Sequence, residues 1–186
     1  MGDRLDAAFD GAPRAWFLPE GAQDRAGFDG PIHIGHDQTC SQPRTVREML
    51  ALLDPAVGDS LLDVGSGSGW TTALLAELVG PTGRVRGVEL EPELVAWGRA
   101  NLARGAWTWA SIEQARPAAV GLPEHGPYDR ILVSADASEI PPDLLDSLGE
   151  DGRMVIPVRG TMTVVDRQGG VDAVTEHGSY RFVPLR

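Results

Sequence analysis

The chain has 186 residues, of which 42% are hydrophobic and 23% are charged, as in a globular protein with a full core. A formal net charge of −11 argues against nonspecific binding to nucleic acid, which needs a basic surface. The sequence holds no apolar run near the ~20 residues of a membrane-spanning helix, and residues 1–10 lack the apolar stretch of a signal peptide. We therefore expect neither nucleic acid nor a membrane as a partner.

Cysteine and histidine usage argues against disulfides and metal ions. Cys40 is the only cysteine, so the chain cannot form an internal disulfide, and the cytoplasm is the default location. We expect Cys40 to be a small buried residue, because a nucleophilic thiol needs a nearby base or cation to lower its pKa. The histidines lack the spacing of metal ligands, so we expect no metal site; they are His33, His36, His125 and His177.

The first part of the chain is typical of an arm that covers a core. Residues 1–30 are rich in glycine, proline, aspartate and alanine, and a short helix is expected from about Arg4 to Asp10. The apolar run Trp16–Leu18 should attach this arm to the core, because large apolar side chains avoid water. Pro31–Gly35 favours a short extended segment. The chain has no repeat or long linker, so we expect one domain, with residues 1–35 as the arm and residues 36–186 as the core.

A helix should follow the segment Gln38–Pro43. Ser41 occupies the position of an N-cap, and Pro43 lies in the first turn, where a missing N–H is tolerated. Two interpretations of Ser41 stay open on the residues alone. Its hydroxyl either caps the helix and nothing more, or it holds an anion together with the amides of the helix start. The apolar residues at helical spacing are Val46, Met49, Leu50 and Leu53.

The clearest motif is the stretch Leu61–Trp70. An apolar run with Asp63 as its one charge is followed by glycines at alternate positions and then by apolar residues at helical spacing. This pattern predicts a strand over residues 60–64, a glycine turn, and a helix over residues 70–79. In an open parallel sheet such a turn lies at the carboxyl edge, where ligands bind.

The spacing of the glycines restricts the ligand. A dinucleotide fingerprint needs a third glycine where Trp70 stands, and a phosphate-binding P-loop needs a Lys-Ser/Thr pair that is missing. A carboxylate at Asp63 would repel phosphate but suits a cation. S-adenosylmethionine carries a sulfonium and an ammonium group and no phosphate, so it fits this pattern.

A second acid supports the same ligand. Arg84–Glu89 is the expected second strand, followed by a helix from Pro92 to Arg104. Glu89 ends that strand 24 residues after Gly65, close to the ~20 residues at which an acid holds a ribose diol in nucleotide-binding folds. Taken singly, each acid could be an ordinary surface or capping residue and the glycines an ordinary turn. In this order and spacing they favour a cofactor site.

The rest of the chain should complete one sheet. Trp109–Ala115 and Tyr128–Ser134 are the expected third and fourth strands, and Ser134 falls at the carboxyl end of the fourth, beside the predicted site. A short helix should cover Pro142–Leu148. Because no long helices separate the last segments, we expect antiparallel pairing there. The last three strands are expected at Gly152–Val158, Thr161–Arg167 and Gly178–Pro184.

With these motifs in place, the sequence resembles the protein-L-isoaspartate O-methyltransferases, a family of class I S-adenosylmethionine-dependent methyltransferases. The resemblance runs from about Pro13 to Leu185. Residues 62–69 mark only the superfamily, whereas Gln38–Pro43 and Phe182–Leu185 are more specific. The matching segments are Pro13-Arg14, Phe17–Pro19, Ile34–Pro43, Leu62–Gly69, Pro127–Ile131, Gly152–Val158 and Phe182–Leu185.

The resemblance implies an α/β fold with a doubly wound, mostly parallel seven-stranded sheet, Rossmann-like, with S-adenosyl-L-methionine at its carboxyl edge. It also implies methyl transfer to the free carboxylate of L-isoaspartyl residues in damaged proteins or peptides. It makes Ser41 the active-site serine, in favour of the second interpretation above. Predicted acceptor-binding residues are Thr39, Ser41 and Ser134. Predicted cofactor-binding residues are Asp63, Gly65, Ser66, Gly67, Gly69, Glu89 and Leu90.

The sequence departs from the family pattern in three places. The family usually has Gly-Asp-Gly after the third strand, with the Asp near the adenine, whereas Arg116-Pro117-Ala118 stands here, and Pro117 has no N–H. Cys40 replaces an aliphatic residue, and the N-terminal region is short. Two rivals therefore stay open: a tailoring methyltransferase for a dedicated peptide or small acceptor, and a non-catalytic cofactor-binding module. We expect a monomer.

A carboxylate acceptor also sets what the site needs. The acceptor is already ionised at neutral pH, so no general base is required. Charge disappears as carboxylate and sulfonium become ester and thioether, and a strong ionic clamp would stabilise the ground state more than the transition state. We therefore expect neutral donors, the Ser41 hydroxyl with Thr39 and backbone amides, and no arginine or lysine clamp on the acceptor carboxylate.

Overall fold

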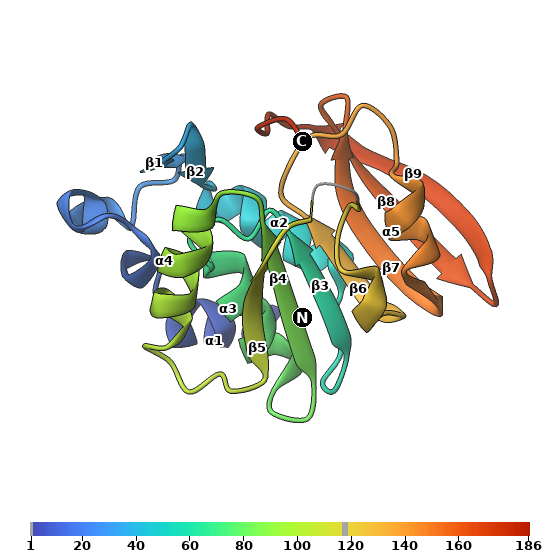
Figure 1. Ribbon diagram of the computed structural model, residues 1–186, viewed down its shortest axis with the longest axis horizontal. Helices are drawn as coiled ribbons and strands as arrows, with labels where there is room; N and C mark the ends of the chain where they lie inside the picture. The colour runs from blue at the N-terminus through green and yellow to red at the C-terminus, as the bar shows by residue number, and fades with distance from the viewer. Residues whose placement is uncertain (1, 117–118) are drawn as a thin grey trace.

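The computed structural model describes residues 2–116 and 119–186, and a seven-stranded sheet is its main element (Figure 1). The strand order is β5-β4-β3-β6-β7-β8-β9. Neighbours from β5 to β7 pair in parallel, whereas β8 and β9 are antiparallel. The predicted fold class is confirmed. The bounds are β3 (Ser60–Val64), β4 (Arg84–Glu89), β5 (Ala110–Gln114), β6 (Tyr128–Val133), β7 (Leu148–Val158), β8 (Thr161–Gln168) and β9 (Val171–Ser179).

Helices and a small hairpin surround this sheet. Within residues 2–116 and 119–186, no helix is both long enough and apolar enough to cross a membrane. The hairpin consists of β1 (Ile32–Gly35) and β2 (Gln38–Cys40). The α-helices are α1 (Gly2–Gly11), α2 (Pro43–Leu53), α3 (Trp70–Val79), α4 (Pro92–Leu102) and α5 (Pro142–Asp146). The 3-10 helices are η1 (Arg14–Phe17), η2 (Glu20–Arg25) and η3 (Pro123–His125).

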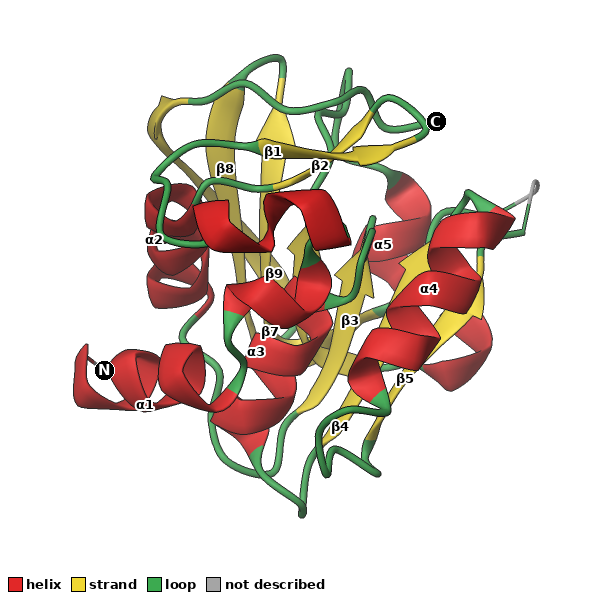
Figure 2. Cartoon of the chain, turned by 90° about the vertical axis from the view of Figure 1, so that its left-hand side faces the viewer, coloured by secondary structure: helices red, strands yellow, loops and turns green. Residues whose placement is uncertain are grey.

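The central parallel strands β3 and β6 are buried on both faces over most of their length, as the near-continuous apolar runs in their sequence require. On one face Leu61 packs with helices α1 to α4, which Figure 2 shows in front of the sheet. On the other face Leu62 packs with α5 and the loop before β6. Helix α3 has nine buried residues out of ten, because α1 of the N-terminal arm covers its outer side through Leu5 and Ala8. An apolar helix this short needs that cover.

The arm is attached as the sequence predicted, through its apolar run. Phe17 and Leu18 are buried, while Trp16 stays 36% exposed. The helix expected from Arg4 to Asp10 forms within α1. The arm therefore contributes side chains to the main core.

The predicted last strand, Gly178–Pro184, is wrong. The strand that pairs with β8 is Val171–Ser179, and every residue of it is exposed. Its sequence carries no burial pattern because neither of its faces is covered. The apolar segment that suggested a strand instead folds back over the carboxyl edge, where Asp136 donates to Val183 and Leu185 donates to Asp136.

The fold places a crevice between β3 and β6. The chain leaves β3 for α3 on one face of the sheet and leaves β6 for α5 on the other. At such a point of reversal the loops diverge, and ligands bind outside the carboxyl ends of the strands. The two ends are tied by one hydrogen bond, in which the Ser134 amide donates to the Val64 carbonyl at 2.8 Å.

Candidate active site

A cleft of about 1170 Å³ opens at this edge of the sheet. Its walls come from segments far apart in the sequence: the hairpin and the start of α2, the glycine loop after β3, the end of β4, and residues 178–186. Figure 2 shows the β1–β2 hairpin and the C-terminus at the end of the molecule to which β3 points. The predicted acceptor residues and most of the predicted cofactor residues therefore lie in one cavity.

The glycine loop needs glycine at three places, for two reasons. Gly65, Gly67 and Gly69 have positive φ of 79°, 51° and 90°, which side chains rarely adopt. Gly65 and Gly67 line the cleft. Gly69 does not line it; a Cβ there would lie 3.0 Å from Ile112 Cδ1 and 3.2 Å from the Gly98 carbonyl. Gly69 therefore lets α3 and α4 approach, which is a packing role and not a ligand contact in this structure.

Asp63 is fully buried behind the loop and does not line the cleft. Its Oδ2 accepts hydrogen bonds from Thr71 Oγ1 at 2.7 Å and Thr72 Oγ1 at 2.6 Å, which tie the strand to the first turn of α3. Its Oδ1 has no hydrogen-bond partner in the described part of the chain. Burial raises the pKa of this carboxyl from 3.8 to about 6. The hydrogen bonds from the two hydroxyls favour the ionised form and lower the pKa, but burial has the larger effect.

Glu89 stands in the cleft at the end of β4, where the sequence predicted an acid. Its Oε2 accepts from the Gly67 amide at 2.8 Å, and its Oε1 accepts from the amides of Leu90 and Glu91 at 2.6 and 3.0 Å. The carboxylate thus fixes the glycine loop against the β4 end. Its Oε2 accepts only one of these bonds and can accept another, so Glu89 can hold the loop and a ligand hydroxyl together. Leu90 also lines the cleft and is 37% exposed.

Two serines add hydroxyls to the lining. Ser66 is 4% exposed, and its Oγ has no partner among the described residues. An unpaired buried hydroxyl costs free energy, so a ligand atom at this place would be stabilised by pairing with it. Ser134 also lines the cleft, directly after the end of β6. Both residues are where the sequence placed them.

The acceptor side of the cleft carries Thr39, Cys40 and Ser41, all in the lining. The prediction that Ser41 is an N-cap is wrong. The N-cap is Gln42, and the amide of Arg44 in the first turn of α2 is bonded at 3.1 Å by the Asp29 carboxylate from the arm. Asp29, which is remote in sequence, therefore caps α2 in place of Ser41. No hydrogen bond within the described residues uses the Ser41 hydroxyl, which can act on a ligand.

Cys40 is buried, as predicted, with 4% of its surface exposed. Burial raises the pKa of its thiol above the ordinary value, although the Arg14 guanidinium nearby acts in the opposite direction. A thiol with a raised pKa holds little thiolate at neutral pH and is a poor nucleophile. Its position beside Ser41 makes it part of the packing beneath the acceptor loop.

Arg14 is a residue that sequence reasoning noticed only as part of a family segment. It is 6% exposed and donates to backbone carbonyls of the arm and of the acceptor loop. The available signal was its place between apolar residues, since arginine is seldom fully buried without partners. Trp70, which occupies the sixth place of the glycine motif, lies under its guanidinium at 5.3 Å from the ring centroid.

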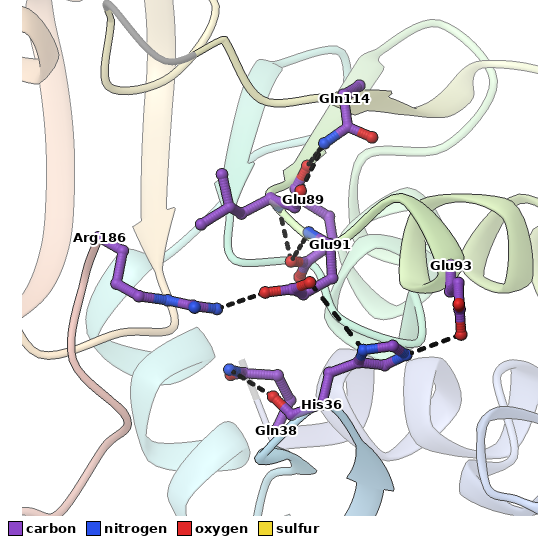
Figure 3. A network of polar contacts seen from close by, with 8 residues as sticks. His36, Gln38, Glu89, Glu91, Glu93, Gln114 and Arg186 are labelled. Atoms are coloured by element: carbon purple, nitrogen blue, oxygen red, sulfur yellow. Dashed lines mark hydrogen bonds and ion pairs between the residues drawn. The ribbon is translucent and has the colours of Figure 1, made fainter.

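A polar network joins three segments at the rim of the cleft (Figure 3). Glu91 accepts from Arg186 at 2.7 Å, and His36 Nδ1 lies 3.9 Å from the same carboxylate. His36 Nε2 lies 3.0 Å from Glu93. The hairpin tip, the start of α4 and the C-terminal segment therefore meet around one acid, as the sticks in Figure 3 show.

No cluster of three or more histidine, cysteine or acidic side chains that could hold a metal occurs within residues 2–116 and 119–186. Chemically, the glycine loop and the serine loop offer backbone amides and small hydroxyls beside the carboxylate of Glu89. Two further acids and four arginines also belong to the cleft lining: Glu48, Asp143, Arg44, Arg116, Arg181 and Arg186. The amides, hydroxyls and Glu89 suit an uncharged sugar-like group on one side and an anion held by neutral donors on the other.

Comparison with known proteins decides the family. The family model described as protein-L-isoaspartate(D-aspartate) O-methyltransferase matches residues 1–186. The chain is 43% identical over 187 aligned positions to the protein-L-isoaspartate O-methyltransferase of Methanococcoides burtonii, covering 98% of this chain and 91% of the relative. The chain belongs to the protein-L-isoaspartate O-methyltransferase family.

Solved structures of the family have the same fold. One protein-L-isoaspartate O-methyltransferase superposes with a TM-score of 0.89 at 22% identity, and the match covers 99% of this chain and 61% of that one. A Plasmodium falciparum protein assigned to the family, solved in complex with S-adenosyl-L-homocysteine, gives a TM-score of 0.84 at 24% identity over 99% of this chain and 90% of its own. At these identities the likeness concerns the fold.

One departure from the family pattern cannot be placed. The family usually has Gly-Asp-Gly where this chain has Arg116-Pro117-Ala118. Of these residues, Pro117 and Ala118 lie outside the part of the chain that the structure describes. Arg116 itself lines the cleft and pairs with Glu124 at 2.5 Å. Arg116 stands at the first glycine of the family pattern, so a guanidinium lines the cleft of this protein-L-isoaspartate O-methyltransferase homologue at that position.

Proposed function

We propose that the protein is an S-adenosyl-L-methionine-dependent O-methyltransferase that esterifies the free carboxylate of L-isoaspartyl residues in damaged proteins or peptides. The observation that carries this proposal is membership of the family over the whole chain, residues 1–186. The geometry supports it, because one cleft joins a glycine loop, an acid at the next strand end and the serine loop. The activity, the acceptor and the cofactor are all part of the proposal.

The residues present fit this cofactor. Glu89 can accept a hydrogen bond from a ribose hydroxyl. The Ser66 hydroxyl has no hydrogen-bond partner within the described residues and can bind a ligand atom. Gly65 and Gly67 let the backbone approach a ligand. Asp63 would act through the loop it supports. The cofactor, when bound, supplies an electrophilic methyl group on a sulfonium. The proposed cofactor residues are Asp63, Gly65, Ser66, Gly67, Gly69, Glu89 and Leu90, with Gly69 acting through packing.

On the acceptor side, the protein's task is orientation. An ionised carboxylate is already a nucleophile, so Ser41 need not remove a proton and can instead donate its hydroxyl to one carboxylate oxygen. Thr39 and Ser134 line the same cavity as further neutral donors. Holding reactants in line while excluding water can supply ~7–11 kcal/mol of the barrier.

The charges near Ser41 support neutral recognition. The sequence contains no lysine. The guanidinium closest to this loop, Arg14, does not line the cleft and donates to backbone carbonyls. Arg44, which does line it, pairs with Glu48 at 3.1 Å. We therefore keep the proposal that no arginine clamps the acceptor carboxylate, since such a clamp would hold the ground state too tightly.

A transfer assay with matched acceptors tests the function. Purified protein is given methyl-labelled S-adenosylmethionine with an isoaspartyl peptide or with the same peptide containing ordinary aspartate. Label on the isoaspartyl peptide alone, released by mild base, supports repair. Label only on another acceptor supports a tailoring enzyme, and cofactor binding without transfer to any acceptor supports a binding module. Either of the last two results refutes the proposal.

We propose in addition that residues 1–186 act as one methyltransferase domain, with residues 1–35 as an arm, and that the protein works as a cytoplasmic monomer without nucleic-acid or membrane partners. The net charge of −11 supports the part on nucleic acid, and the single cysteine suits a reducing compartment. Sedimentation of the purified protein tests the oligomeric state.

A further inference from the structure

We infer that Arg14 is a positioning residue for Ser41, which fixes the direction of the serine hydroxyl by holding the backbone on which it sits. The inference rests on the proposed function, in which Ser41 orients the acceptor. Arg14 comes from η1 in the arm, 27 positions before Ser41. Its role is therefore a tertiary one that local sequence around the serine does not reveal.

The first support is the set of acceptors that Arg14 holds. Its Nη2 donates to the carbonyls of Gly30, Cys40 and Ser41 at 2.8, 3.0 and 2.9 Å. Its Nη1 donates to the Phe28 carbonyl at 2.8 Å. One planar group thus binds two chain segments, the end of the arm before β1 and the acceptor loop after β2. A guanidinium offers five N–H donors in a fixed plane, which few other side chains could match.

The second support is the contact between the Arg14 guanidinium and the ring of Trp70. The group lies over the Trp70 ring, and the Trp70 indole donates to the Ala12 carbonyl at 3.0 Å. Trp70 begins α3 directly after the glycine loop and lines the cleft. Arg14 therefore connects the acceptor loop to the cofactor loop through an aromatic residue, which gives a reason for tryptophan at a place where nucleotide-binding motifs carry glycine.

The third support is that the Ser41 carbonyl is held while its hydroxyl is not used within the described residues. Fixing the carbonyl and that of Cys40 sets the backbone around the serine, and through it the direction of Cβ. Ser41 also lies before Pro43, whose fixed φ limits the other side of the loop. Arg14 does not line the cleft, so it can act on the acceptor only through this backbone.

The test is a double-mutant cycle. Arg14→Lys keeps the charge but replaces the planar fork by one ammonium, which cannot hold all the carbonyls. Since a displacement of ~1 Å can cost about 100-fold, we expect kcat for an isoaspartyl peptide to fall about 10- to 100-fold, with the Kd for S-adenosylmethionine changed less than about threefold. In a Ser41→Ala background, Arg14→Lys should lower kcat by less than about threefold further.

A matched control is available in the same arm. Arg4 donates to the carbonyls of Pro55 and Leu78 at 3.1 and 2.7 Å, and none of these three residues lines the cleft. Arg4→Lys loses comparable bonds and should leave kcat and the cofactor Kd unchanged. Equal losses of kcat from Arg14→Lys in the two Ser41 backgrounds would overturn the inference, as would an unchanged kcat in the wild-type background.

Hydrogen exchange separates a failure of this inference from a failure of the proposed function. If the wild type methylates no isoaspartyl peptide, the function is refuted, and exchange in residues 38–42 then decides the positioning role. Arg14→Lys should speed exchange there and leave residues 2–11 unchanged, whereas unchanged exchange refutes it. If the lysine variant does not fold, Arg14→Gln, which removes the buried charge and keeps two N–H donors, takes its place in both measurements.

Discussion

The buried carboxyl of Asp63 should make the stability of this protein depend on pH in an unusual direction. Its pKa in the folded protein is about 6, above the ordinary 3.8 of the unfolded chain, because the group is fully buried and Glu89 adds negative charge nearby. The folded state therefore binds the proton more tightly than the unfolded state. Its contribution to the free energy of unfolding is fully present below pH ~4 and is lost as the pH rises to ~6.

The size of the loss follows from the shift. One pKa unit corresponds to 1.36 kcal/mol, so about two units give about 3 kcal/mol. Asp63→Asn removes the titration and keeps an oxygen for the hydroxyls of Thr71 and Thr72. Any fixed cost of the new amide cancels when variants are compared across pH. Between pH 4 and pH 7, the free energy of unfolding of the variant should therefore rise by about 3 kcal/mol relative to wild type.

Urea denaturation of the two proteins, followed by circular dichroism at several pH values without cofactor, measures this difference. A difference that stays constant within about 1 kcal/mol would refute the reasoning. Asp172→Asn is the control of opposite sign. Its ion pair with Arg167 lowers the pKa of Asp172. As the pH rises through the acid range, the free energy of unfolding of wild type should therefore increase relative to that of Asp172→Asn.

Three further substitutions test other parts of the site. Ser41→Ala should lower kcat about 10- to 100-fold with little change in cofactor affinity, measured by steady-state kinetics and calorimetry, because it removes one positioned donor. Glu89→Gln should weaken S-adenosylmethionine binding about 10- to 100-fold, because an amide cannot accept all three backbone N–H bonds; unchanged calorimetric affinity contradicts this. Gly69→Ala should lower the free energy of unfolding by about 1–3 kcal/mol in denaturant titrations, because a Cβ at φ 90° would crowd Ile112 and Gly98; an unchanged midpoint contradicts this.

Sequence reasoning succeeded where local pattern and burial coincide. The strands Ser60–Val64 and Arg84–Glu89 and the helix Trp70–Val79 form with the predicted bounds. Their apolar runs are bounded by glycine or proline, so both the type and the limits of each element are set within a few residues. The same holds for Glu89, whose place at a strand end puts it in the cleft.

It failed where a distant segment takes over a local role. Ser41 has the composition of a helix cap, yet Asp29 from the arm caps α2. Gly178–Pro184 was predicted as a strand, yet this segment lines the cleft, while the exposed Val171–Ser179 pairs with β8. Arg14 was not distinguished as a site residue because its partners are carbonyls, which have no sequence signature.

Glu91 holds together two segments that are 150 positions apart, through His36 and Arg186. The contact with Arg186 is an ion pair between partly exposed side chains, so dissolved salt weakens it. Because Arg186 lines the cleft and this ion pair ties it to the start of α4, the residence time of a bound ligand should shorten as the ionic strength rises.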